Sequence, residues 1–105
     1  MKVYLVRERK RINAVGEYDM ETKALTVKKG SRVSEGIAYT EKFRGAKTIE
    51  KDRAGTVKDH IVTKDISFKS ASTAANFVTG TSTNGKIAWK DENGKSLKEI
   101  QAEEI

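Results

Sequence analysis

Three short segments near the N-terminus alternate apolar and polar residues, and they are joined by connections of only a few residues. The segments span residues 2–7, 12–18 and 24–29. Alternation with a period of two is typical of a β-strand that buries one face. Parallel strands need a crossover of about a dozen residues or more, so connections this short require antiparallel neighbours. The pattern therefore predicts a three-stranded antiparallel meander.

The stretch that begins at Ile66 predicts a fourth strand followed by a helix. Ile66 and Phe68 alternate with polar residues, which again indicates a strand. Ser70 can act as the N-cap of the helix, because its hydroxyl can accept a hydrogen bond from a first-turn N–H group. Gly80 stands where a left-handed C-terminal cap is needed, a conformation that glycine adopts without steric cost.

Residues 86–90 predict a further strand, because Asn-Gly turn signals lie on both sides of them. Ile87 and Trp89 alternate with polar residues and small side chains, so they are expected to point to one face. We expect Trp89 in the core, and Leu97 returns to it after the second turn. Ala14 and Gly16, in the second strand, are small enough to let an aromatic ring or another backbone approach closely.

Residues 40–53 predict a basic amphipathic helix. Thr40 is the candidate N-cap, and Phe43, Ala46 and Ile49 recur every third residue as a narrow apolar stripe. Gly45 would then lie in the helix interior. The opposite face is rich in cations, which are Lys42, Arg44, Lys47, Lys51 and Arg53.

Together these elements predict an α+β fold. We expect a small antiparallel sheet, made of the N-terminal three-stranded meander plus one or two C-terminal strands, packed with two or three short helices. The last of these helices would begin at Ser96 and turn Leu97 and Ile100 inward. A chain of 105 residues has the size of one domain, so we expect a single domain over 1–105.

The composition argues against several classes of site. The chain contains no cysteine and one histidine, so we expect no disulfide, no protein-built metal site and no cofactor. No apolar run approaches the roughly 20 residues of a membrane span, and the first residues lack the apolar core of a signal peptide. We therefore expect a cytoplasmic protein of bacterial type that does not contact a membrane.

The sequence contains no complete catalytic motif. Gly80–Lys86 matches the phosphate-binding pattern G-x-x-x-x-G-K. However, Ile87 follows where that motif needs serine or threonine, and the predicted order of elements is wrong for it. Nothing in the spacing supports a triad around His60. We therefore expect that the protein is not an enzyme.

The run from Phe68 to Leu97 resembles the pattern F-x-S-P-S-A-A…G-x-S-x-N-G…W-K-D…G-x-x-L of a bacterial domain of unknown function, found at the C-terminus of GIY-YIG nuclease-family proteins. The matching residues are Phe68, Ser70, Ser72, Ala74, Ala75, Gly80, Ser82, Asn84, Gly85, Trp89, Lys90, Asp91, Gly94 and Leu97. Upstream, Val27–Ser31 looks like the family's V-x-K-G-S element. Ala71 replaces the usual proline, and Lys86 replaces a tryptophan. The resemblance implies no catalytic residue, and it suggests nucleic-acid handling by association only.

The net charge of +6 is concentrated before residue 70 and raises the expectation of a polyanionic partner. Ordinary solubility charge is the alternative. If the basic residues converge on one face, they would track the phosphate backbone of DNA or RNA. The candidate residues are Arg7, Arg9, Lys10, Arg11, Lys28, Lys29, Arg32, Lys42, Arg44 and Lys47.

A second hypothesis treats the charge as incidental. In that case the domain would be a protein-protein interaction module, in which an exposed strand edge or an apolar groove receives a protein partner. The nucleic-acid hypothesis ranks first and predicts an accessory module that contacts the phosphate backbone without catalysis.

Overall fold

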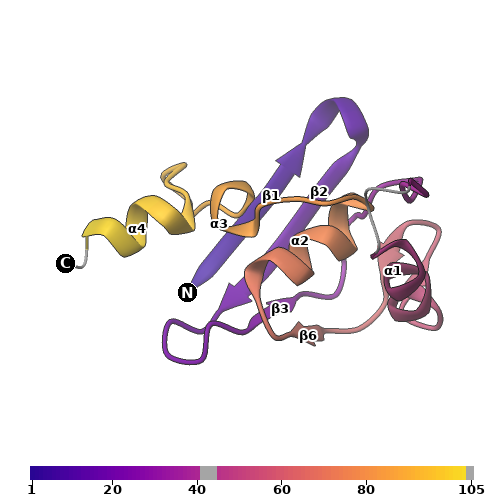
Figure 1. Ribbon diagram of the computed structural model, residues 1–105, viewed down its shortest axis with the longest axis horizontal. Helices are drawn as coiled ribbons and strands as arrows, with labels where there is room; N and C mark the ends of the chain where they lie inside the picture. Colours follow the sequence, from indigo (N-terminus) through magenta and orange to yellow (C-terminus); the bar gives the residue numbers. More distant parts are fainter. Residues whose placement is uncertain (41–44, 104–105) are drawn as a thin grey trace.

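A four-stranded antiparallel sheet forms the scaffold of the computed structural model, which describes residues 1–40 and 45–103 (Figure 1). Its strands, in spatial order, are β1 (Lys2–Arg7), β2 (Ile12–Tyr18), β3 (Leu25–Val27) and β6 (Ile66–Phe68). Every neighbouring pair is antiparallel. The predicted meander and the α+β class are therefore confirmed, and the strand that precedes the main helix joins the sheet beside β3.

One face of the sheet forms the core, and helix α2 (Ala71–Thr79) lies across it (Figure 1). The alternation in the strands decides which side chains point there, so Leu5 is 1% exposed whereas its neighbour Val6 is 52% exposed. The Oγ atom of Ser70 accepts a hydrogen bond from the N–H of Thr73 at 3.1 Å. Gly80 ends the helix with a left-handed φ of 76°. Both predicted caps of this helix are confirmed.

The predicted strand over 86–90 is wrong. Residues Gly85–Ala88 form a short helix, α3, which begins where the Asn84 side chain accepts the N–H of Lys86 at 3.1 Å. In a helical turn, residues two apart do not share a face. As a result, Ile87 is 51% exposed while Trp89 is fully buried.

The ring of Trp89 packs against β2 at Gly16. A Cβ atom built at Gly16 would lie 3.2 Å from Cζ3 of Trp89 and 2.8 Å from Cδ2 of Leu25. A side chain at this position would therefore force the Leu25 and Trp89 side chains to shift. The prediction that a small residue in the second strand admits an aromatic ring is therefore confirmed.

Helix α1 (Ala46–Arg53) is shorter than the predicted helix. Gly45 occupies the N-cap position of this helix. The prediction that Thr40 is the N-cap is therefore wrong, and so is the prediction that Gly45 lies in the helix interior. Ala46 and Ile49 are buried as expected. Phe43, the third member of the predicted apolar stripe, lies outside the described residues.

A second, two-stranded sheet pairs β4 (Val57–Lys58) with β5 (Ile61–Val62). The turn between them is formed by Asp59 and His60, whose φ values of 52° and 66° are both left-handed. The sequence did not predict this hairpin, because Asp-His lacks the glycine that usually marks such a turn.

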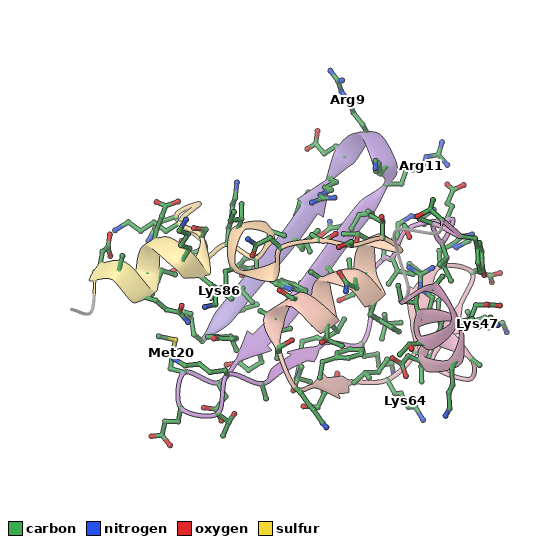
Figure 2. All side chains as sticks on the ribbon, viewed as in Figure 1. Arg9, Arg11, Met20, Lys47, Lys64 and Lys86 are labelled. Carbon is green, nitrogen blue, oxygen red and sulfur yellow. The ribbon has the colours of Figure 1, made fainter. Side chains whose placement is uncertain are left out.

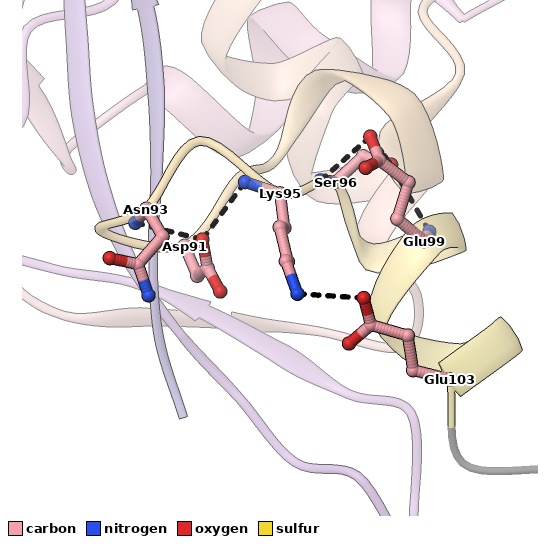
Figure 3. A network of polar contacts seen from close by, with 6 residues as sticks. All are labelled: Asp91, Asn93, Lys95, Ser96, Glu99 and Glu103. Carbon is pink, nitrogen blue, oxygen red and sulfur yellow. Dashed lines mark hydrogen bonds and ion pairs between the residues drawn. The ribbon is translucent and has the colours of Figure 1, made fainter.

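The last described element is helix α4 (Leu97–Glu103), which begins after Ser96 as predicted. The Oγ atom of Ser96 accepts the N–H of Glu99 at 3.2 Å, and the carboxylate of Glu99 accepts the N–H of Ser96 at 3.4 Å (Figure 3). This reciprocal pair is a capping box. Within 1–40 and 45–103, no helix is long and apolar enough to cross a membrane.

Candidate functional site

The hairpin between β1 and β2 carries three adjacent cations at its tip, which are Arg9, Lys10 and Arg11. The turn is a 3-10 helix, η1 (Glu8–Lys10), followed by Arg11 in a left-handed conformation with a φ of 56°. The N–H of Arg11 donates to the carbonyl oxygen of Glu8 at 3.0 Å, which closes the turn. All three cationic side chains are exposed, and Figure 2 shows that Arg9 and Arg11 point away from the body of the molecule. We call these three residues the hairpin tip.

An open hollow of about 500 Å³ lies beside the hairpin tip. The tip cations form one wall, and residues 34–36 and 79–81 contribute the other. Glu35 is the acidic residue of this lining, and its Oε1 lies 3.7 Å from Nη1 of Arg11. Both side chains are more than half exposed, so this ion pair is weak. The hollow therefore combines three cations with one loosely paired carboxylate.

Arg53 holds the second wall of the hollow in place. Its guanidinium donates to the carbonyl oxygen of Ser34 at 3.1 Å and to that of Phe77 at 2.8 Å. It also lies 5.8 Å from the centre of the Phe77 ring. Burial lowers the pKa of this guanidinium. The sequence pattern placed Arg53 on the outer face of its helix. In the structure its positive charge instead lies at the C-terminal end of α2, where it stabilises the last carbonyl groups of that helix.

Lys28 and Lys29, after β3, are held by Asp65. The Nζ atom of Lys28 lies 2.9 Å from Oδ2 of Asp65, and the backbone N–H of Lys29 donates to Oδ1 at 2.8 Å. These two hydrogen bonds, the backbone one first, lower the pKa of the Asp65 carboxyl. A ligand phosphate would have to compete with this carboxylate for Lys28.

We expect the Asp65 carboxyl to titrate below the ordinary value of about 3.9 when it is followed by NMR. Its depressed pKa stabilises the fold above that ordinary value, and the contribution is lost as the pH falls through the folded-state pKa. In Lys28→Met the pKa should rise only part of the way, because the N–H of Lys29 remains. A pKa that returns fully to 3.9 would contradict the leading role of that backbone bond.

The other predicted cations are divided among separate parts of the fold. Arg7 ends β1, and Arg32 forms a backbone bridge to the second residue of β2, so both lie near the hairpin tip. Lys47 projects from α1, and Figure 2 shows that it points in a different direction from Arg9. Lys42 and Arg44 lie outside the described residues. The structure thus brings together the cations of the hairpin and separates them from Lys47.

Several residues that carry the family resemblance have structural partners. The Oγ atom of Ser72 accepts the N–H of Gly85, and the Nε1–H of Trp89 donates to the carbonyl oxygen of Ala71, both at 3.0 Å. Asp91 Oδ1 accepts two backbone N–H groups of its own turn, each at 2.9 Å (Figure 3). Among the described residues, no group of three or more His, Cys, Asp or Glu side chains could hold a metal. These motif residues therefore build the fold.

The fold and the site define a small α+β domain with a basic hairpin tip beside an open hollow. A family model described as a domain of unknown function (DUF4357) matches residues 5–101. The chain belongs to this family, since the match spans nearly its whole length. No curated protein and no solved structure matches the chain.

Proposed function

We propose that this domain is a non-catalytic module that binds nucleic acid through its backbone phosphates at the hairpin tip. The observation that carries the proposal is the hairpin tip itself, where three adjacent exposed cations border an open hollow and face one weakly paired carboxylate, Glu35. Lysine and arginine contacts to phosphate release condensed counterions, which is the main source of sequence-independent affinity.

Three further points support the proposal. The chain has a net charge of +6, which favours association with a polyanion. Its resemblance to a domain that accompanies GIY-YIG nucleases points to the same class of partner by association. A non-catalytic role agrees with the use of Ser72, Trp89 and Asp91 in hydrogen bonds that hold turns and helices.

Replacing Arg9, Lys10 and Arg11 with glutamine should weaken binding to all nucleic acid sequences alike. Each phosphate contact to duplex DNA contributes about 0.9 to the slope of log affinity against log salt concentration. The slope of the triple variant should therefore fall by up to about 2.7, three times that value. Fluorescence anisotropy with a labelled DNA duplex at several salt concentrations measures this change.

A matched control replaces Lys47, Lys51 and Lys64 with glutamine, which removes the same charge from exposed positions on α1 and in the loop between β5 and β6. Figure 2 shows that Lys47 and Lys64 point away from the tip. The control should keep most of the affinity. Equal losses in the two triple variants would mean that only the net charge matters, and the proposed site would be wrong.

The protein-interaction hypothesis keeps one supporting observation, which is that Val6 is half exposed on the edge strand β1. Lys90 pairs with Tyr4 on this edge, with N···O distances of 2.7 and 2.9 Å, so only part of it is open to a partner strand. Undetectable or salt-insensitive binding of nucleic acid would favour this second hypothesis.

A further inference from the structure

We infer that the nucleic acid backbone continues from the hairpin tip across the solvent face of the sheet, where Arg32 and Lys58 contact its phosphates. The inference rests on the proposed function and adds to it the surface over which the backbone runs. It assigns a binding role to Lys58, which lies in a different hairpin from the tip.

Arg32 joins the two sheets of the fold into one ladder. The N–H of Asn13 donates to the carbonyl oxygen of Arg32 at 3.0 Å, and the N–H of Arg32 donates back to that of Asn13 at 2.8 Å. Arg32 also forms an antiparallel bridge to Ile61 of β5, which pairs with β4. Five segments therefore lie side by side, in the order β1, β2, Arg32, β5 and β4. Neighbouring segments are about 4.8 Å apart, so the ladder is about 19 Å wide.

One row of side chains crosses this ladder on the solvent face. Residues directly opposite each other in an antiparallel pair share a face. The pairings place in one row Val6, Asn13, Arg32, Ile61 and Lys58. All five are exposed or half-buried. The residues next to them in the chain belong to the core on the other face and are Leu5, Ala14, Val33 and Val62. We call the five residues the outer row.

The charge of the outer row is complementary to a phosphate backbone. The row holds two cations and no acidic residue. Among the described residues, neither Arg32 nor Lys58 forms an ion pair, whereas Lys28 is held by Asp65. The two cations are two segments apart, a distance of about 10 Å. Asn13 follows the last residue of the hairpin tip by two positions, so the row extends the positive charge of the tip across the sheet.

The width of the ladder decides which part of a duplex it can contact. The major groove of B-form DNA is about 12 Å wide, so a flat surface of about 19 Å rests on the phosphates at its rims. Phosphate contacts position a protein on nucleic acid without reading its sequence. The outer row therefore adds affinity and orientation to the proposed function, and we expect equal affinities for duplexes of different sequence.

The test replaces Arg32 and Lys58 together with glutamine. The slope of log affinity against log salt concentration for a labelled DNA duplex should fall by up to about 1.8, which is twice the contribution of one phosphate contact. A matched control replaces Lys47 and Lys86 with glutamine. These two exposed lysines belong to α1 and α3, outside the ladder, and their removal should leave the slope close to that of the wild type.

A second variant, Asn13→Asp, adds a carboxylate of nearly the same shape to the middle of the outer row. Repulsion of the phosphates should lower the affinity at least about threefold at low salt, and the effect should shrink as salt is added. Asn93→Asp adds the same charge to an exposed turn outside the row. This control should change the affinity much less.

The outcomes separate this inference from the proposed function. If the variant without Arg32 and Lys58 keeps the wild-type slope while the hairpin-tip variant loses it, phosphate binding at the tip stands and the outer row is wrong. Equal effects of Asn13→Asp and Asn93→Asp would also overturn the inference. If no nucleic acid binds, both proposals fail. Circular dichroism of each variant verifies that it is folded.

Discussion

Replacing Trp89 with alanine should lower the free energy of unfolding by about 3–5 kcal/mol, the usual cost of removing a large aromatic side chain from a core. Trp89 is fully buried, and its ring fills the space that Gly16 leaves on β2. A small domain is stable by only about 5–15 kcal/mol, so this one change removes a large part of the total. Urea denaturation followed by circular dichroism measures the loss, since the variant has no tryptophan to report by fluorescence.

Trp89→Phe provides the companion measurement if the alanine variant does not fold. Phenylalanine keeps much of the apolar volume but loses the hydrogen bond from Nε1–H to the carbonyl oxygen of Ala71. Losing this one hydrogen bond should cost about 0.5–1.5 kcal/mol, the usual net contribution of a neutral hydrogen bond. A Trp89→Phe protein as stable as the wild type would show that the hydrogen bond contributes little.

Gly85→Ala should destabilise the domain by about 3 kcal/mol through overpacking. The backbone of Gly85 lies directly against the backbone of Ala71, so a Cβ atom at Gly85 would overlap that backbone. Backbone atoms cannot rotate out of the way as the end of a side chain can. The change would also strain the hydrogen bond from the N–H of Gly85 to Ser72. Thermal unfolding and urea denaturation measure the effect.

Gly36→Ala is the matched control for this prediction. Nothing lies within 4 Å of a Cβ atom built at Gly36, and its φ is not in the left-handed region. Its stability should stay within about 0.5 kcal/mol of the wild type. If the two glycine variants were equally stable, the close contact between α3 and the start of α2 would not be what position 85 requires.

These contacts give a physical reason for the spacing of the motif residues. Ser72 and Gly85 are 13 positions apart and meet across one hydrogen bond, and Ala71 and Trp89 meet 18 positions apart. The two contacts fix the start of α2 against α3 and the buried ring. Residues that make such contacts are explained by the stability of the fold, so they do not indicate a functional site. The exposed cations of the hairpin tip have no such structural explanation.

The sequence by itself determined the elements whose signals are local. The meander follows from alternation and short connections, and α2 follows from a serine N-cap and a glycine C-cap. Ser96 and Glu99 likewise form a capping box within four residues. In each of these elements the residues that decide the conformation are neighbours along the chain.

Only the tertiary structure decided the rest. Ile87 and Trp89 alternate as in a strand. In the structure, Gly85 packs against the start of α2 and begins a helical turn, which exposes Ile87 and buries Trp89. The sequence pattern predicts that Arg53 lies on the outer face of its helix. In the structure its guanidinium binds the carbonyl oxygens of Ser34 and of Phe77, near the end of α2. The hollow beside the hairpin tip likewise joins residues from distant parts of the chain. Such features depend on which surfaces meet in space, and a pattern of neighbouring residues does not contain that information.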